Sequence, residues 1–276
     1  MSITAKQVQD LRKMSGAGMM ECKAALSESG GEIDQAFKIL REKGIAKAEK
    51  KSGRDANEGL IGIKIFHNSA AIVEINSETD FVSRNKEFHA LVNGILDISI
   101  AEKGNFDSIF LKTKDKLNDA VGKIGENIVF KRSGYLEGDI HTYIHNSLAE
   151  GLGKIGVIIS LSSDKKIDLS QVGKSLCMHI AASSPQSISK DDLDESVISS
   201  EREIIVQQLK DIDKPEEILS KMIDGKINKF LEEIILLKQK FVINPELSIE
   251  KYLSEESSKL DSNIKIEKFI RFEIGQ

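Results

Sequence analysis

The chain of 276 residues contains no tryptophan, three prolines and two cysteines, and aromatic residues make up 5% of it. Cys22 and Cys177 are far apart and have no histidine or cysteine partners at metal-site spacing, so we expect neither a disulfide framework nor a zinc site. No apolar run reaches the roughly 18 residues of a membrane-spanning helix. The N-terminal segment has no apolar signal region. A reducing, cytosolic location is therefore expected.

Motifs for common enzyme chemistry are also missing. The sequence has no phosphate-binding loop, no dinucleotide-binding fingerprint and no Gly-x-Ser-x-Gly. Its histidines are scattered, and His141 and His145 lie in or beside a predicted strand that is too extended for them to clamp one metal ion. We therefore expect no cofactor, no bound metal and no catalytic residue. A hydrolase that uses scattered carboxylates and His179 is the weakest alternative, and the absence of catalytic motifs favours a binding protein.

Charge is present in abundance but is distributed unevenly. The net charge is −5, so the chain as a whole is not expected to bind polyanions. Residues 1–54 carry 11 Lys and Arg against 7 Asp and Glu, a net charge of +4. This basic segment indicates a surface for a polar partner, although a solvated helical face would give the same pattern.

Residues 1–54 are predicted to form a domain of three short helices. The first begins at a Thr4 cap, the second spans about residues 19–29, and the third spans about 32–43 with Gly44 as its C-terminal stop. Residues 45–57 are charged and poor in large apolar side chains. They are predicted to be a linker, helical at most at its beginning.

A β-hairpin followed by a helix is predicted twice in the rest of the chain. The first copy has strands at 59–66 and 70–76 and an amphipathic helix at about 80–101. The second has strands at 139–144 and 154–162 and a helix at 168–183, with a further strand at 126–131 before it. The repetition predicts an α+β core of two related halves, residues 55–137 and 138–276.

The second half is interrupted by two further helical segments. They span about residues 196–211 and 216–230 and are separated by Asp213-Lys214-Pro215. Their apolar stripes can face each other only if the two segments fold back antiparallel, which predicts a helical arm at about 187–226. Residues 265–274 alternate between apolar and polar side chains and are predicted to form a closing strand.

The segment Thr79-Asp80-Phe81-Val82-Ser83-Arg84-Asn85 joins the first hairpin to its helix. Thr79 or Asp80 is predicted to cap the helix with a side-chain oxygen. Phe81, in the first turn, has two possible orientations. It can pack inward against the helix, as most aromatic residues do. It can also point outward as an anchor for a pocket in a partner.

Two longer motifs connect the chain to a known family. One spans residues 11–26 and includes SGAGMMECKAAL at 15–26, and the other is ETDFVSRN at 78–85. In these motifs the chain resembles bacterial elongation factor Ts, the family of nucleotide exchange factors for elongation factor Tu. Residues 123–127, 178–182 and 271–273 add weaker similarity.

The resemblance implies a ubiquitin-associated-type domain at the N-terminus, a duplicated core and an inserted coiled-coil arm. It also implies that Asp80 and Phe81, within the segment Thr79–Val82, enter the GTPase domain of elongation factor Tu and displace the elements that hold the magnesium ion of the nucleotide. Arg12, Met19 and Met20 correspond to family residues that contact the same GTPase domain, although one of the two methionines can instead fill a small core.

The chain also departs from the family pattern. Many members continue past the closing strand into a further helix that packs on the partner, and we expect the contacts of that helix to be absent. The loop 145–153 looks longer than in some members, so a role for His145 stays open. We expect no direct nucleic-acid partner and no membrane partner. The alternative function is a non-enzymatic adaptor or chaperone-like scaffold that uses its three-helix domain to hold a peptide or a ubiquitin-like surface.

Overall fold

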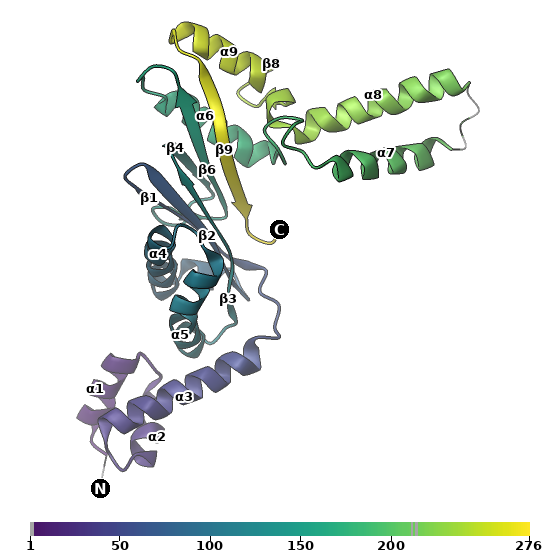
Figure 1. Cartoon of the computed structure of the whole chain (residues 1–276). Helices are drawn as coiled ribbons and strands as arrows, with labels where there is room; N and C mark the ends of the chain where they lie inside the picture. Colours follow the sequence, from purple (N-terminus) through teal and green to yellow (C-terminus); the bar gives the residue numbers. More distant parts are fainter. Residues whose placement is uncertain (1–2, 211, 213–214) are drawn as a thin grey trace. The chain divides into compact units, whose positions relative to one another are not determined.

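The computed structural model describes residues 3–210, 212 and 215–276 and mixes helices with antiparallel strands, as the α+β prediction requires (Figure 1). The chain divides into two compact units. The first comprises the residues up to Tyr135 together with 144–156 and 272–276, and the second comprises 136–143 and 157–271. Within the described residues, no helix is long and apolar enough to cross a membrane.

The N-terminal segment forms helices α1 (Ala5–Ser15), α2 (Met19–Glu28) and α3 (Ile33–Lys51) around a small core that includes Leu11 and Leu26. Three helices were predicted here, but the predicted stop at Gly44 is wrong, because α3 continues through it. The residues after Gly44 are mainly Ala, Lys and Glu, which favour helix, and Ala48 packs against the large core of the first unit. These gains outweigh the cost of one glycine inside a helix.

The first sheet has the strand order β3-β2-β1-β5, with β1 at Glu58–Phe66, β2 at Ser69–Ser77, β3 at Ile128–Glu137 and β5 at Leu152–Gly153. Strands β1 and β2 form the predicted antiparallel hairpin, and every residue of β2 is buried. Helix α4 (Lys86–Ala101) packs on both strands. A Cβ atom at Gly62 of β1 would lie 2.7 Å from Cγ1 of Val92, so glycine is needed for this close approach.

The start of helix α4 differs from the prediction. A short 3-10 helix, η1 (Val82–Arg84), precedes α4, and the Asn85 side chain accepts a hydrogen bond from the Glu87 amide as the helix cap. The predicted caps Thr79 and Asp80 are therefore wrong. Helix α4 begins only at Lys86, after the 3-10 helix, so its first free amides lie beyond the reach of Thr79, whose hydroxyl donates to Glu126.

Helix α5 (Phe106–Ile124) was not predicted. Asn105 caps its first turn, and Gly125 ends it in the left-handed conformation, with φ of 85°. The buried side of α5 contains Ile109, Leu117 and Val121, and the helix packs on α3 and α4. It therefore completes the hydrophobic core beneath α4, and a segment of three residues, 125–127, connects it to β3.

The second sheet has the strand order β4-β6-β9, with β4 at Asp139–His145, β6 at Ile155–Ser163 and β9 at Ile264–Glu273. Helix α6 (Ser170–Ser183) follows β6. The second predicted hairpin-plus-helix copy and the closing strand are thus present. The guanidinium group of Arg271 donates to the Ala181 carbonyl oxygen of α6, at 3.1 Å from Nη2. The His141 ring of β4 fills the space that a Cβ atom at Gly173 of α6 would need.

Helices α7 (Glu195–Leu209) and α8 (Glu216–Ile234) run antiparallel (Figure 1). Their shared cluster includes the buried side chains of Ile205, Leu209 and Leu231, as the apolar stripes predict. Helix α8 continues four residues past the predicted end at residue 230. Of the predicted boundary and turn residues, Asp211, Asp213 and Lys214 lie outside the described residues.

A small region after α8 was also not predicted. It contains η2 (Leu236–Lys238), the strands β7 (Lys240–Phe241) and β8 (Asn244–Ser248), and helix α9 (Ile249–Lys259). His179 of α6 is fully buried against this region, with Nε2 2.9 Å from Oε1 of Gln239 and Nδ1 accepting a hydrogen bond from the Val242 amide at 3.3 Å. Burial lowers the pKa of the His179 imidazole, which favours the neutral form of the ring. This histidine is structural.

We expect the stability of the protein to fall as the pH drops below about 6.5, the ordinary histidine value. Because the pKa of His179 is lower in the folded protein than in the unfolded chain, the unfolded chain binds the proton more readily in this range, and protonation favours unfolding by up to about 1.4 kcal/mol per pH unit. Chemical unfolding of the wild type and His179→Gln between pH 7.5 and 5.5 measures this effect, with His67→Gln as an exposed control. Equal pH slopes for the wild type and His179→Gln would contradict it.

Candidate functional site

The loop between β2 and η1 presents an exposed aromatic side chain. The Phe81 ring is 79% exposed, and Asp80 beside it is also exposed. The inward orientation of Phe81 is therefore wrong, and the outward orientation holds. An aromatic residue of this size that is exposed at a loop tip has the chemistry of an interface anchor.

The C-terminal side of this loop is anchored in the core. Val82 is 6% exposed and belongs to the same hydrophobic cluster as Phe88. The buried Ser83 hydroxyl donates to the Gly59 carbonyl oxygen of β1 at 2.9 Å. Nζ of Lys154 lies 3.3 Å from the Ser83 hydroxyl and also donates to the Gly59 carbonyl. Val82 is thus a packing residue and not part of the exposed tip.

The N-terminal side of the loop is held by the segment between α5 and β3. The Thr79 amide donates to Oε2 of Glu126 at 2.9 Å, and the Thr79 hydroxyl donates to Oε1 of the same carboxylate at 2.6 Å. In the opposite direction, the Asn127 amide donates to Oε1 of Glu78 at 2.7 Å. That amide first, and then the Arg54 guanidinium, hold the pKa of Glu78 below its ordinary value.

Sequence reasoning did not identify Glu126 and Asn127 as residues of the site. They appeared only in a short motif that contributed to the family resemblance and at the start of the predicted strand 126–131. One local signal was available, since a glutamate and an asparagine directly follow the helix-ending Gly125 and precede strand β3. What sequence alone does not show is that this pair lies beside Glu78 and Thr79, which are almost 50 residues away in the chain.

The predicted partner-binding residues of the N-terminal segment lie on α1 and α2. Arg12 is exposed, Met19 is 54% exposed and Met20 is 75% exposed. Neither methionine belongs to the small core of these helices, so the interpretation that one of them fills it is wrong. The exposed candidates therefore form two groups on different elements, one on α1 and α2 and one on the loop after β2.

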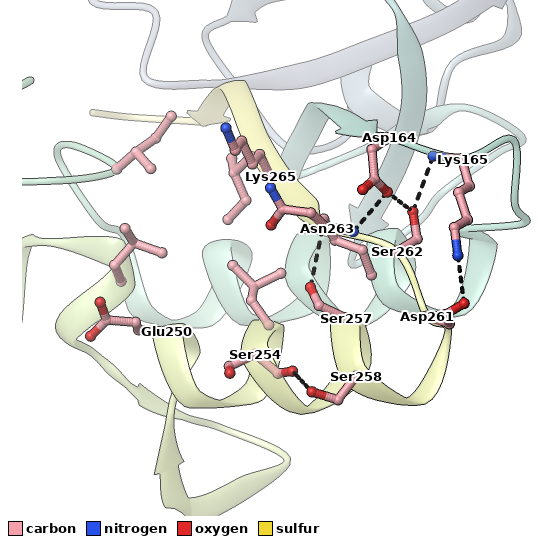
Figure 2. Close-up of a pocket in the computed structure, with 15 residues that line it drawn as sticks. Asp164, Lys165, Glu250, Ser254, Ser257, Ser258, Asp261, Ser262, Asn263 and Lys265 are labelled. Atoms are coloured by element: carbon pink, nitrogen blue, oxygen red, sulfur yellow. Dashed lines mark hydrogen bonds and ion pairs between the residues drawn. The ribbon is translucent and has the colours of Figure 1, made fainter.

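The second unit contains a pocket of about 700 Å³ between α9 and the start of β9 (Figure 2). Its polar groups are largely paired with one another. Asp164 accepts hydrogen bonds from the Ser262 hydroxyl and from the Asn263 amide, and Lys165 forms an ion pair with Asp261. These bonds lower the pKa of Asp164, the Ser262 bond first. Within the described residues, no cluster of His, Cys, Asp or Glu could hold a metal ion.

Comparison with known proteins decides the family. The family model described as "Elongation factor TS" matches residues 78–276. Elongation factor Ts of Bartonella henselae is 44% identical over 288 residues, which covers 100% of this chain and 94% of the relative. Elongation factor Ts of Agrobacterium fabrum is 42% identical over 286 residues, covering 99% and 93%. The chain belongs to the elongation factor Ts family.

Elongation factor Ts of Parvibaculum lavamentivorans is 41% identical over 286 residues, again covering 99% of this chain and 93% of the relative. The match to the elongation factor Ts family model begins at Glu78, the first residue of the loop. It therefore contains the exposed tip as well as Glu126 and Asn127. Arg12, Met19 and Met20 precede it and lie only within the full-length alignments.

Because the Phe81 ring is mostly exposed, we expect Phe81→Ala to change the melting temperature very little. The matched control is Phe88→Ala, which removes a fully buried ring of the same size seven residues further along the chain. It should cost about 3–5 kcal/mol of stability. Thermal unfolding of both variants tests this contrast. A loss of stability in Phe81→Ala as large as in Phe88→Ala would mean that the ring is packed in solution.

Proposed function

We propose that this protein is a guanine nucleotide exchange factor for elongation factor Tu in translation elongation. One observation carries the proposal together with the family: Phe81 is exposed on a loop that is anchored on both sides. Such a loop can enter a partner protein without rearranging the fold that carries it. The proposed activity consists of binding to the partner and needs no covalent step, so we propose that the protein is not an enzyme in the bond-making sense.

Thermodynamic linkage explains how binding alone can release a nucleotide. If the exchange factor binds nucleotide-free elongation factor Tu more tightly than the GDP-bound form, it must weaken GDP binding by the same factor. The protein therefore binds both forms of the partner and favours the nucleotide-free one. Burial of the Phe81 ring in a pocket of the partner would supply about 1.5–3 kcal/mol towards this difference.

The magnesium ion of the bound nucleotide is the element we propose to be displaced. The ion neutralises phosphate charge, so its loss leaves that charge uncompensated and weakens GDP binding. Asp80 and Phe81 would enter the GTPase domain and disturb the elements that hold the ion. Thr79 and Val82 would support them, Thr79 through its bonds to Glu126 and Val82 through its packing in the core.

The N-terminal helices supply a second proposed contact. We assign residues 1–54 to a ubiquitin-associated-type domain that docks on the same GTPase domain through Arg12, Met19 and Met20. Their exposure and the net charge of +4 in this segment support a docking role. Residues 55–137 and 138–276 would then form the two related halves of the core.

The helices α7 and α8 are proposed to form the coiled-coil arm of the family, at about 187–226. They contain none of the residues assigned to exchange. The proposed setting is the cytoplasm, with elongation factor Tu as the partner and with no direct contact to nucleic acid or membrane.

The direct test is the release of a fluorescent GDP analogue from elongation factor Tu. Catalytic amounts of this protein should accelerate release, and Phe81→Ala should remove most of the acceleration because it removes the inserted ring. Asp80→Ala should also slow exchange. Since both residues act through one loop, the double variant should lose less than the product of the single effects predicts. No acceleration by the wild type at saturating concentration would refute the proposed function.

The arm should be dispensable for exchange. Ser187 is hydrogen-bonded to the end of α8, so the deletion variant should keep both ends of the arm. In this variant a short Gly/Ser linker replaces residues 198–227. The rate of GDP release should stay within a few-fold of the wild type, a difference of roughly 1 kcal/mol or less. A hundredfold loss in a folded variant would show that α7 and α8 help to grip the nucleotide-binding domain.

A further inference from the structure

We infer that Glu126 is a positioning residue for nucleotide exchange, and that its carboxylate fixes the backbone from which Phe81 projects. This inference rests on the proposed exchange function and assigns a part in that function to a residue outside the loop. Glu126 is partly buried and is not part of the exposed tip, so it would act through Thr79 and not by contact with the partner.

The contact between Glu126 and Thr79 uses both oxygens of the carboxylate. Oε2 accepts from the Thr79 amide at 2.9 Å and Oε1 accepts from the Thr79 hydroxyl at 2.6 Å. Hydrogen bonds to an ionised acceptor are shorter and stronger than neutral ones. Two such bonds to one residue fix both the position and the rotation of the Thr79 backbone, two residues before Phe81.

A reciprocal bond strengthens this attachment. Glu78 accepts a hydrogen bond from the Asn127 amide. Two neighbouring residues of the loop, Glu78 and Thr79, are thus bonded to two neighbouring residues of the segment between α5 and β3. The Asn127 side chain also donates to the Arg54 carbonyl oxygen at 2.7 Å. The segment is therefore connected to the chain before β1 as well as to the loop.

The element that carries Glu126 is itself well fixed. It lies between the end of α5 at Ile124 and the start of β3 at Ile128, and Asn127 is only 5% exposed. A carboxylate mounted between a helix and a strand has little freedom to move. It can therefore hold the loop in one conformation before the partner binds.

The loop has anchors on both sides of its tip. Thr79 is bound to Glu126, and Val82 is buried, so only Asp80 and Phe81 lie between the two fixed positions. Without the Glu126 carboxylate, Thr79 would lose the bonds to its amide and hydroxyl and would keep only the Ser77 hydroxyl bond to its carbonyl oxygen, beside the Glu78–Asn127 bond. The weakened N-terminal anchor would leave Phe81 to be ordered in part during binding. That ordering costs conformational entropy and leaves less binding energy to displace the nucleotide.

The test compares Glu126→Ala and Glu126→Gln with the wild type in the GDP-release assay, at equal concentrations of folded protein. Glu126→Ala should lower the rate at saturating concentration about tenfold, the effect of losing charge-assisted hydrogen bonds. Glu126→Gln keeps one acceptor and should restore part of the rate. The matched control is Glu102→Ala, which removes a carboxylate bonded to Ser108 and Lys112 in the same unit and should leave exchange unchanged.

A double-variant cycle separates positioning from general support of the fold. If Glu126 acts through Phe81, adding Glu126→Ala to Phe81→Ala should change the remaining rate by less than about twofold. An equal tenfold loss in both backgrounds would show that Glu126 supports only the fold and would overturn the inference. If Glu126→Ala does not fold, Glu126→Gln carries the same cycle, with an expected loss of about threefold.

The result for the wild type separates the proposed exchange function from the positioning role of Glu126. A wild-type protein that does not accelerate GDP release would refute the proposed function itself. A wild-type protein that does accelerate it, with Glu126→Ala equally active and Glu102→Ala unchanged, would leave that function intact and overturn the positioning role.

Discussion

An exposed phenylalanine has to be held in place without being buried, and the first unit is organised around this constraint. The Phe81 ring cannot fix its own position by packing, so its neighbours must do so. Val82 and Ser83 attach one side of the loop to the core and to β1, and Thr79 attaches the other side to Glu126. Helices α4 and α5 matter to function because their buried side chains form the core beneath Val82, and because the segment that carries Glu126 follows the end of α5.

The sequence predicts much of the fold because the repeated elements carry strong local patterns. Both hairpins, the helices α4 and α6 and the pair α7 and α8 are found where apolar spacing and turn residues indicate them. The errors arise where a local signal competes with packing. Gly44 is a plausible helix stop, but the contact of Ala48 with the core carries α3 past it. Helix α5 has the usual start and stop signals, Asn105 and Gly125. It was missed because the predicted repeat contained one hairpin and one helix, and α5 is a second helix after the first hairpin.

The candidate site is predictable in part for the same reason. The motif at 78–85 identifies the loop but does not separate exposed residues from anchoring ones. Asp80 and Phe81 are exposed, whereas Val82 is in the core and Thr79 is occupied by Glu126. The capping error has a similar origin, because Thr79 has the right chemistry for a cap, but α4 begins only at Lys86 and the Thr79 hydroxyl has Glu126 as its partner. That partner comes from a contact almost 50 residues distant in sequence, which no local pattern contains.

The first unit is discontinuous in the chain, and this affects the order in which the protein can fold during synthesis. Strand β5 at Leu152–Gly153 pairs with β1 at Ile61–Gly62, about 90 residues earlier, and residues 272–276 join the same unit after the whole of 157–271 has been made. Domains generally fold as units while the ribosome adds residues from the N-terminus. The hairpin of β1 and β2 can therefore form early, but the edge of β1 stays unpaired until residue 153 has emerged. A chain that stalls before that point would present an open strand edge to other nascent chains.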